Sequence, residues 1–393
     1  MSEWKEYRLG DFIEFNPKIS LKKDVVARKI AMDQLVPYSR DIYSWSYEPY
    51  SGGAKFQNGD TIMARITPCL ENGKHAYISL LDEKETAFGS TEYIVMRGKE
   101  NISDNKFVYY LTHYPFFKNA AVKSMVGSSG RQRAQVVVLE NLTMNLPSLS
   151  EQIRIAEMLS EIDDKIAVNR RICENLEAQA QALFKHWFID FAPFKNGKFV
   201  ESELGMIPEG WRVGTLGEIA VITMGQSPAG SSYNEKGEGV IFYQGRTEFG
   251  FRYPSVRLYT TEPKRFAEPL STLLSVRAPV GDINVATERC CIGRGLASIK
   301  SNKNCHSYIF YLLQSMKRRF DVYNGEGTVF GSINKDTLNG LKIFIPNNTI
   351  ISDFEEIVEE IDKKILESHQ ESSRLSSLRD TLLPKLMSGE IKV

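Results

Sequence analysis

Two long stretches of the chain place apolar residues at alternating steps of three and four. The first begins after Pro147, where Ser148 or Ser150 can cap a helix, and continues without a glycine or proline. Its seam is Ile155, Leu159, Ile162, Ile166, Asn169, Cys173, Leu176, Ala180 and Leu183. The second seam is Phe354, Val358, Ile361, Ile365, Ser368, Ser372, Leu375, Arg379 and Leu382. This spacing predicts two long helices of coiled-coil type.

The middle of each seam is polar, with Asn169 and Cys173 in the first helix and Ser368 and Ser372 in the second. Antiparallel pairing would bring the two middles face to face, where these side chains could satisfy one another and fix the register. Alternatively, each helix packs on its own globular segment and its polar residues face water. We expect the antiparallel pair, with looser pairing of the second helix because its seam carries Ser368, Ser372 and Arg379.

The chain also repeats itself at a distance of about 200 residues. Leu9–Gly10 recur as Leu216–Gly217, Phe107–Leu111 as Tyr308–Leu312, and Ile162–Ile166 as Ile361–Ile365. This period is too long for a solenoid and predicts a two-unit protein with a pseudo-two-fold internal repeat. By the same equivalence, residues 384–393 should run from the second helix back towards Trp4, as residues 185–210 run from the first helix into the second globular segment.

The segments outside the helices predict a mixed α/β (α+β) fold. Expected strands are Thr61–Ala64, Tyr93–Met96, Gln135–Val138, Thr272–Val276 and Leu341–Ile345. The aromatic stretch Phe107–Phe117 fits a short amphipathic helix whose rings belong to the core rather than to a base-stacking surface. The predicted order is a globular segment (1–147), a long helix (148–190), a linker with a second globular segment (191–346), and a second long helix with a tail (347–393).

Charge alternates along this order although the whole chain, with 49 basic and 49 acidic residues, is neutral. The four segments carry net charges of +2, −3, +5 and −4 in turn. A partner with a phosphate backbone would favour the basic globular segments and avoid the acidic helices. The sequence has no run of 18 apolar residues, the length needed to cross a membrane, and its N-terminus lacks the apolar run of a signal peptide. We therefore expect a cytoplasmic protein.

Two runs within the globular segments carry positive charge alone. Five basic residues and no acidic one lie between Asp104 and Glu140, and seven basic residues lie between Glu288 and Asp321. The glycine-, serine- and arginine-containing loop Gly127–Arg133 offers a closely approaching backbone together with donors that suit guanine and adenine edges. An ordinary surface loop is the alternative. The equivalent loop of the second segment, Gly325–Thr328, is also glycine-rich but differs in chemistry.

Together these features give a set of candidate DNA contacts. In the first segment they are Arg65, Lys74, Lys123, Ser128, Ser129, Arg131, Gln132 and Arg133, and in the second Arg246, Arg277, Arg294, Lys317, Arg318, Arg319 and Thr328. Arg65 and Arg277 are included because they follow matching strands, although either could pair with a local carboxylate instead.

Motifs for catalysis are missing from the chain. It contains no Asn/Asp-Pro-Pro-Tyr/Phe tetrapeptide of amino-methyltransferases, no phosphate-binding Gly-x-x-x-x-Gly-Lys-Ser/Thr loop and no dinucleotide fingerprint. Cys290, Cys291, Cys305 and His306 form the one cluster with any resemblance to a metal site, and their spacing matches no common zinc site. We expect no catalytic residue, no metal and no cofactor in this chain.

Several stretches resemble the specificity subunits of type I restriction–modification enzymes. The linker 183–191 with Gly205–Trp211, the helix start Leu146–Ile153 and the C-terminal residues 382–391 are similar to that family's helix-flanking motifs. Gly89–Tyr93 and Ile292–Leu296 resemble recurring pieces of its two target-recognition domains.

The resemblance implies that residues 1–147 and 191–346 hold two target-recognition domains, each reading half of a bipartite site on double-stranded DNA. The long helices would act as spacers of roughly 50 Å. Two modification subunits would bring S-adenosylmethionine and methylate adenine, and restriction subunits would bring ATP and Mg²⁺. Two other interpretations stay open: a nuclease or methyltransferase with unrecognised motifs, and a coiled-coil scaffold that never touches DNA.

Overall fold

The computed structural model describes residues 4–324 and 331–393. The chain divides into two compact units. Unit 1 comprises Met1–Arg171 and Ser368–Val393, and unit 2 comprises Ile172–Glu367. This division differs from the four predicted segments, because each unit takes one half of each long helix. The two units are therefore described one at a time.

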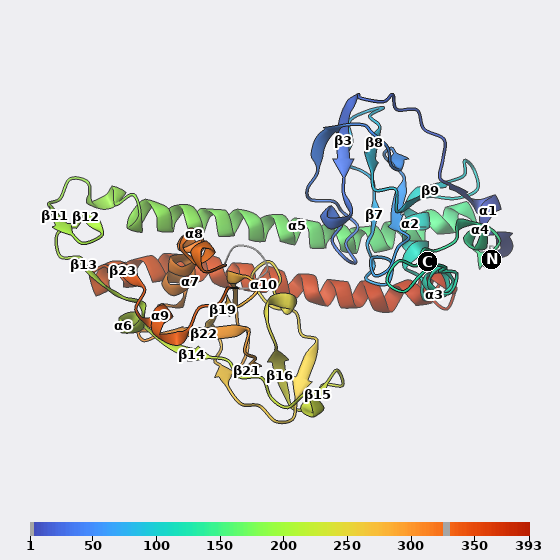
Figure 1. Ribbon diagram of the computed structural model, residues 1–393. Helices are drawn as coiled ribbons and strands as arrows, with labels where there is room; N and C mark the ends of the chain where they lie inside the picture. The colour runs from blue at the N-terminus through green and yellow to red at the C-terminus, as the bar shows by residue number, and fades with distance from the viewer. Residues whose placement is uncertain (1–3, 325–330) are drawn as a thin grey trace. The chain divides into compact units, whose positions relative to one another are not determined.

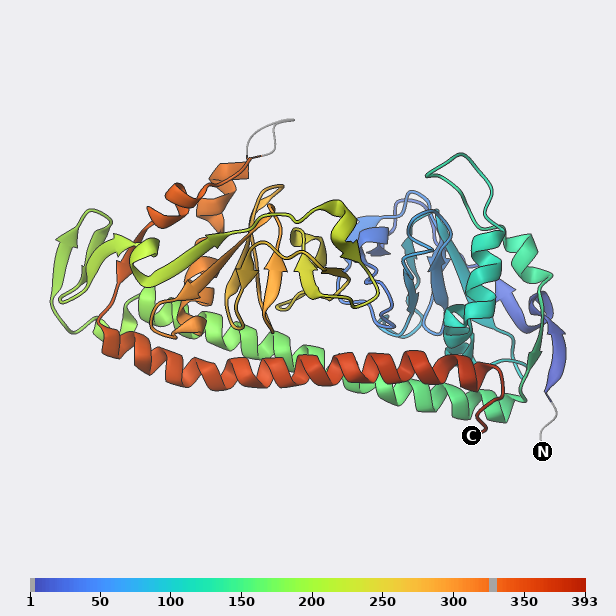
Figure 2. The ribbon, with the colours of Figure 1, turned by 90° about the horizontal axis from the view of Figure 1, so that it is seen from below.

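Two helices of 40 residues each, α5 (Leu149–Phe188) and α10 (Asn348–Met387), form where the heptad patterns predict them. Helix α5 begins directly after Ser148, whose carbonyl accepts a bond of 3.0 Å from the Glu151 amide. The N-terminal half of α5 and the C-terminal half of α10 belong to unit 1, and the other halves belong to unit 2. In each unit the two halves lie side by side (Figure 2).

The pairing is antiparallel in both units, as predicted. In unit 1, Nη1 of Arg379 lies 2.7 Å from Oδ1 of Asp163, and Nδ2 of Asn169 donates to Glu371 at 2.7 Å. In unit 2, Sγ of Cys173 lies 3.6 Å from the carbonyl oxygen of Ile365. Partner numbers fall as α5 numbers rise, which only an antiparallel pair allows. The alternative of helices that pack separately is wrong.

The polar middles of the seams behave differently from the prediction. Asn169 finds its partner in Glu371, outside the predicted seam, and the Ser372 hydroxyl donates to the Ser368 carbonyl of its own helix at 2.9 Å. Arg379 does not loosen the pair, because its buried guanidinium forms an ion pair with Asp163. The side chains of Asn169 and Ser372 therefore bond elsewhere than to the facing seam residues, and in unit 1 the Asn169–Glu371 bond and the Arg379–Asp163 ion pair join the two helices instead.

Unit 1 contains two four-stranded sheets, with strand orders β2-β9-β6-β7 and β4-β3-β8-β5. The strands are β1 (Lys5–Arg8), β2 (Ile13–Phe15), β3 (Val26–Ile30), β4 (Ser46–Pro49), β5 (Lys55–Phe56), β6 (Thr61–Ala64), β7 (His75–Tyr77), β8 (Ala87–Gly89), β9 (Tyr93–Gly98) and β10 (Thr143–Leu146). The short helices are α1 (Leu9–Phe12), η1 (Met32–Gln34), α2 (Asn105–His113), α3 (Pro115–Lys123) and α4 (Val136–Glu140). Strands β1 and β10 pair antiparallel. Figure 1 shows β3 and β8 side by side, and these two strands pair in parallel.

Two sequence predictions in unit 1 need correction. The stretch 107–117 is not one helix, because Pro115 starts α3 after a break at Tyr114; the rings of Phe107 and Phe117 are buried as expected. Residues 135–138 are not a strand: Gln135 is the N-cap of α4 and residues 136–138 lie within that helix. Three consecutive valines favour a strand locally, but burial of Leu139 in the core of the unit outweighs that preference.

Unit 2 repeats this plan, with a fifth strand in its second sheet. Its sheets have the orders β14-β22-β19-β20 and β15-β17-β16-β21-β18, and β11-β12 and β13-β23 form separate antiparallel pairs. The strands are β11 (Phe199–Ser202), β12 (Gly205–Pro208), β13 (Arg212–Thr215), β14 (Ala220–Met224), β15 (Tyr233–Asn234), β16 (Val240–Tyr243), β17 (Leu258–Thr260), β18 (Phe266–Ala267), β19 (Thr272–Val276), β20 (Val280–Val285), β21 (Cys290–Ile292), β22 (Leu296–Ser301) and β23 (Lys342–Ile345). The short helices are η2 (Ala192–Phe194), α6 (Leu216–Ile219), η3 (Gly230–Ser232), η4 (Arg246–Glu248), α7 (His306–Ser315), α8 (Lys317–Asp321), η5 (Val322–Asn324) and α9 (Lys335–Asn339).

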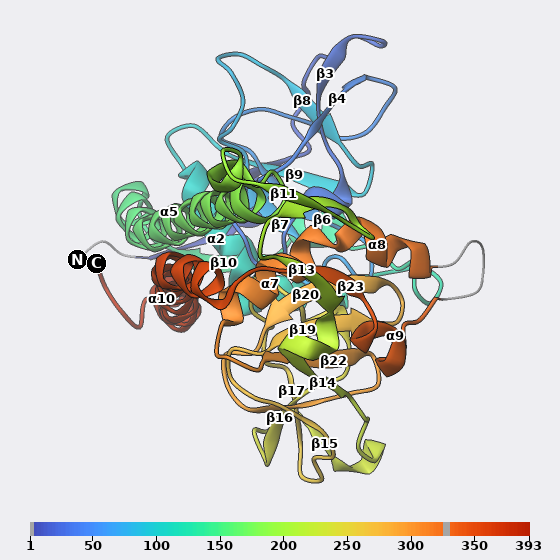
Figure 3. The same ribbon diagram turned by 90° about the vertical axis from the view of Figure 1, so that its left-hand side faces the viewer.

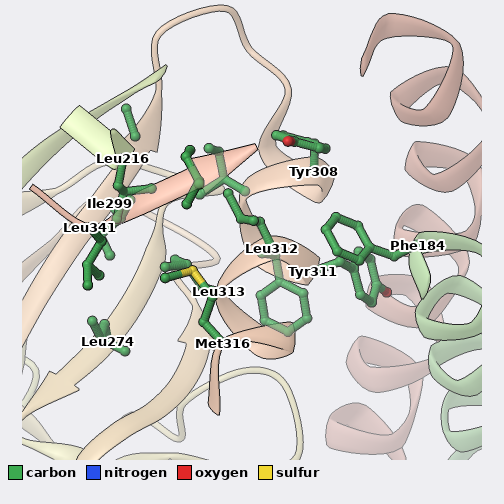
Figure 4. Close-up of a cluster of buried hydrophobic side chains, with 14 of the residues drawn as sticks. Phe184, Leu216, Leu274, Ile299, Tyr308, Tyr311, Leu312, Leu313, Met316 and Leu341 are labelled. Atoms are coloured by element: carbon green, nitrogen blue, oxygen red, sulfur yellow. The ribbon is translucent and has the colours of Figure 1, made fainter. Parts of the chain in front are cut away.

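Helix α7 lies between the β14-β22-β19-β20 sheet of unit 2 and the long helices (Figure 3). Figure 4 shows Tyr308 and Tyr311 on the side of α7 that faces Phe184 of α5, and Leu313 on the side that faces Leu274 of the sheet. All five side chains belong to one hydrophobic cluster, and none of the five is more than 3% exposed. The β14-β22-β19-β20 sheet and the helix pair of unit 2 therefore share one core.

The chain closes on itself within unit 1. A methyl group on Gly389 would lie 3.2 Å from Cε2 of Trp4, and the Trp4 indole donates to Glu151 at 3.3 Å. In unit 2, the end of α5 meets the equivalent tryptophan, since the rings of Phe188 and Trp211 are 5.9 Å apart. The predicted return of the C-terminus towards Trp4 is confirmed.

Candidate nucleic-acid interface

The loop of residues 126–133 in unit 1 stands on a short two-stranded stem. The amides of Arg133 and Val126 each donate to the other's carbonyl, at 3.0 and 3.1 Å, and Arg131 donates to the carbonyl of Ser128 at 2.9 Å. Gly127 and Gly130 have φ angles of 139° and 76°, which L side chains rarely adopt. Glycine is therefore needed to make the turn.

The tip of this loop is open to solvent. Ser128, Ser129 and Arg131 are exposed, and Gln132 and Arg133 are half-buried near the stem. Gln132 connects the loop to the segment after β6, because its carbonyl accepts a bond of 3.0 Å from Thr67. The structure thus brings five of the predicted residues into one displayed loop.

Arg65, Glu92 and Arg133 lie on three neighbouring backbone segments at the base of the loop. The Arg65 amide donates to the Glu92 carbonyl at 2.9 Å, and the Ala134 amide donates to the Arg65 carbonyl at 2.8 Å. The Arg133 guanidinium forms an ion pair with the Glu92 carboxylate, with Nη2 at 2.7 Å from Oε1. The hydrogen bond from Arg133 lowers the pKa of Glu92, so the carboxylate is ionised. Arg65 leaves its buried Nε without a partner in the part of the chain that is described.

Two predicted contacts of unit 1 lie apart from the loop itself. Lys123 is exposed at the last turn of α3, three residues before Val126. Lys74 is half-buried, and its ammonium donates to the carbonyl of Met32 at 2.7 Å. Lys74 therefore has an internal role that sequence reasoning did not foresee.

In unit 2 the predicted cations fall into two groups. Arg246 and Lys317 both bind Asp282, and these bonds, working against its partial burial, lower the pKa of that carboxyl. Arg319 donates to the carbonyl of Lys342 at 2.8 Å. The others are exposed and, among residues 4–324 and 331–393, form no ion pair: Arg277, Arg294 and Arg318. Thr328 lies outside the described residues.

Arg65 and Arg277 do not occupy equivalent positions. Ala134 donates to Arg65, whereas its counterpart Ile333 donates to Val276 at 3.2 Å, so Arg65 corresponds to Val276. Arg277 corresponds to Ile66, which forms the matching bridge to the loop stem. Both arginines follow matching strands, as predicted, but one residue out of register. A one-residue shift places the side chains on opposite faces.

Sequence reasoning missed a buried charge cluster in unit 2. The guanidinium of Arg252 bonds to Glu177 of α5, to Asp362 of α10 at 2.8 Å and to the Tyr311 hydroxyl at 2.7 Å. Arg252 is 3% exposed. Burial alone would lower the pKa of Arg252, but Asp362 and the other acidic neighbours raise it, so the guanidinium is permanently charged.

Unit 1 has a counterpart of this cluster. Tyr110 donates to Asp163 at 2.7 Å, as Tyr311 does to Asp362 at 3.1 Å. The loop arginine is Arg40, whose Nη2 lies 2.6 Å from Asp164 of α5. The repeats of residues 107–111 and 162–166 already contained these tyrosines and aspartates. Their pairing was therefore a signal available in the sequence.

Metal-ligating and nucleophilic groups do not converge in the described part of the chain. Over those residues no group of three histidine, cysteine or acidic side chains is arranged to hold a metal ion. All five cysteines are free thiols. Burial lowers the pKa of His75 to about 3, so its ring is neutral beside that of His113, 4.8 Å away. Among the described helices none has the length and apolar character needed to cross a bilayer.

Comparison with known proteins gives a consistent result. The family described as "Type I restriction modification DNA specificity domain" matches residues 1–178 and again residues 208–374. The putative type I restriction enzyme MjaX specificity subunit of Methanocaldococcus jannaschii is 36% identical over 343 residues, which cover 85% of this chain and 79% of the relative. The HindI specificity subunit of Haemophilus influenzae is 24% identical over the whole of both chains.

A solved structure agrees with the fold. The S subunit of a type I restriction–modification system from M. genitalium shares 17% identity, with a TM-score of 0.56 over 98% of this chain and 96% of that one. The duplicated sheets, the antiparallel helices and the double match to the family model together lead to one assignment: the chain belongs to the type I restriction–modification DNA specificity family.

Proposed function

We propose that this chain is the DNA-recognition subunit of a type I restriction–modification complex and that each unit reads one half of a bipartite site. The observation that carries the proposal is the double match of the family model, once over most of unit 1 and once over most of unit 2. Each matched region presents exposed cations beside a turn: Arg131 in unit 1, and Arg277 and Arg294 in unit 2. Unpaired arginines of this kind suit both phosphate contacts and base readout.

The chemistry of modification and cleavage would come from other chains. Under this proposal two modification subunits supply S-adenosylmethionine and restriction subunits supply ATP and Mg²⁺, while this chain selects the sequence. The role needs access to chromosomal DNA, which favours a cytoplasmic location. The acidic exposed face of α10 in unit 2, including Asp353, Glu356 and Glu360, would repel DNA and suits a protein neighbour.

A selection on random DNA tests the proposal whichever bases the chain recognises. The purified full chain is equilibrated with a library of duplexes that carry a long randomised stretch, and the bound fraction is sequenced. We expect an enriched motif in two parts with an unread gap. Affinity for the selected duplex should also fall steeply with salt, because each phosphate contact releases a counterion.

Two variants test whether each unit reads its own half of the motif. Replacing Arg131 and Arg133 together by alanine should weaken one half of the motif, and Arg277→Ala should weaken the other. Equal loss in both halves would contradict separate reading, and the absence of any enriched motif for the wild-type chain would contradict DNA recognition itself. Methyl transfer from radiolabelled S-adenosylmethionine to DNA by the purified chain alone would favour an enzyme instead.

A further inference from the structure

The Glu92 carboxylate binds the Arg133 guanidinium of the unit 1 loop and leaves two of its N–H donors free. Nε of Arg133 lies 2.9 Å from both Glu92 oxygens, and Nη2 lies 2.7 Å from Oε1. Nη1 donates to the Arg131 carbonyl at 3.3 Å. A guanidinium has five N–H groups, so one on Nη1 and one on Nη2 remain. The Arg133 side chain is 42% exposed, which leaves that end of the fork accessible.

The backbone around this pair is fixed on both sides. Arg133 belongs to the loop stem through its paired bonds with Val126, and Glu92 directly precedes β9. Arg65 lies between them and is hydrogen-bonded to the Glu92 carbonyl. Three neighbouring segments therefore determine where the guanidinium stands. Such pre-organisation reduces the entropy that an arginine loses on binding.

The charge of the site favours a base edge over a phosphate. Glu92 neutralises Arg133 and would repel a phosphate placed against the same fork, whereas the neutral edge of guanine offers two acceptors, N7 and O6, to a pair of parallel N–H groups. Arg131, exposed at the tip of the loop, is better suited to the phosphate backbone. The two arginines of one loop thus differ in the ligand they suit.

We propose that Glu92 is a positioning residue that holds Arg133 for two-bond readout of a guanine in the half-site recognised by unit 1. This inference rests on the proposed function and names a specificity determinant within it. Sequence analysis placed Arg133 among the DNA contacts but did not single out Glu92.

Unit 2 has no equivalent device among its described residues. The position of Glu92 corresponds to Gly295, because the Val276 amide donates to the Gly295 carbonyl at 2.8 Å as Arg65 does to Glu92. The position of Arg133 corresponds to Ser332 through the bridge to Arg277. Gly295 has no carboxylate to bind an arginine, and Ser332 has no guanidinium to be held. A loss of guanine preference on removal of the carboxylate should therefore be confined to one half of the motif.

A simpler explanation treats the pair as a surface ion pair that only stabilises the loop. The two explanations differ in what the loss of Glu92 changes. A stabilising pair would affect binding to all sequences alike, whereas a positioned reader affects one base pair. The experiment must therefore measure the base preference at every position and not only the affinity.

The test repeats the selection on randomised duplexes with four versions of the full chain: wild type, Glu92→Gln, Arg133→Lys and Glu268→Gln. Glu268→Gln is the matched control, because it breaks an exposed arginine–glutamate pair with Arg289 in unit 2. Glu92→Gln should reduce the preference for guanine at one position by about tenfold and leave the other positions intact. Arg133→Lys should flatten the same position while the salt dependence stays the same, since the charge is retained. The control should leave the whole motif unchanged.

The possible outcomes separate the two levels of the proposal. A wild-type motif that both Glu92→Gln and Arg133→Lys leave unaltered would overturn the role of the pair while DNA recognition stands. Uniform weakening at all positions would do the same and identify a structural or phosphate contact. A wild-type chain that selects no motif would overturn the proposed function and this inference with it. If one variant fails to fold, the other still decides.

Discussion

Replacing Arg252 by methionine should destabilise unit 2 strongly. The change removes the positive charge that lies between Glu177 and Asp362 and keeps a side chain of similar length. Arg252 is 3% exposed and Glu177 8% exposed, so water cannot replace the lost bonds. Breaking a buried ion pair by removing one partner costs about 3–5 kcal/mol, because the remaining charges stay buried without compensation. The urea midpoint should fall by roughly 1–2 M.

The pH dependence gives this prediction its distinctive feature. Burial raises the pKa of Asp362 above its usual value, and Arg252 acts against that rise. In Arg252→Met the pKa of Asp362 should rise further. A carboxyl group whose pKa is raised in the folded state adds stability below its unfolded pKa and loses it as the pH rises through the folded value. The variant should therefore be most destabilised at neutral pH and recover part of the loss on mild acidification.

Equilibrium urea unfolding of the full chain, followed by its intrinsic tryptophan fluorescence, to which Trp187 and Trp211 of unit 2 contribute, measures both effects. Arg289→Met, which removes an exposed partner of Glu268, is the control and should change stability by no more than about 0.5 kcal/mol. Adding Glu177→Gln and Asp362→Asn to Arg252→Met should restore most of the loss, since no buried charge then remains at these three positions. A cost below about 1 kcal/mol that does not vary with pH would refute the reasoning.

Three further predictions concern unit 1. Burial lowers the pKa of His75 to about 3 in the folded state, below its unfolded value of about 6.5. The free energy of unfolding should therefore fall by about 1.4 kcal/mol for each pH unit of acidification below pH 6.5. His75→Gln should reduce this slope of unfolding free energy against pH by the same amount, as measured by urea unfolding at several pH values. Trp4→Ala should cost about 1–3 kcal/mol in the same assay, because it removes the ring packed on Gly389 and the bond to Glu151. Arg131→Ala should lower the slope of log affinity against log salt by about one in a titration with the selected duplex, and an unchanged slope would exclude a phosphate contact by this residue.

The periodic parts of the fold could be predicted from the sequence, because a heptad seam over about 30 residues strongly favours one structure. Helices α5 and α10 start at Leu149 and Asn348, one residue after the predicted starts at 148 and 347. Strands such as Thr61–Ala64 and Thr272–Val276 were also predicted correctly. The prediction of a strand at 135–138 was wrong, because local strand preference does not show that Leu139 is buried by helical packing.

The candidate site was predictable only in part. The glycines of the loop 127–133 indicate a turn, and its exposed Ser128, Ser129 and Arg131 follow from composition. Glu92, in contrast, is 41 residues from Arg133, and only the pairing of neighbouring strands brings them together. The one-residue difference in register between Arg65 and Arg277 could not be predicted from the sequence either. A shift of one residue between two aligned strands leaves the pattern of a short motif almost unchanged.

The two units differ least where the globular part meets the helices and most where the turns face solvent. Tyr110 and Tyr311 bind equivalent aspartates, and Arg40 and Arg252 hold equivalent backbone positions, since their carbonyls accept bonds from Tyr77 and Val285 at 3.0 and 2.8 Å. At the base of the turn, in contrast, Arg65, Glu92 and Arg133 correspond to Val276, Gly295 and Ser332. Attachment to the helices places the same geometric demand on both copies, so equivalent residues can meet it twice. Reading two different half-sites requires different donors and acceptors, and the charged trio therefore belongs to one copy alone.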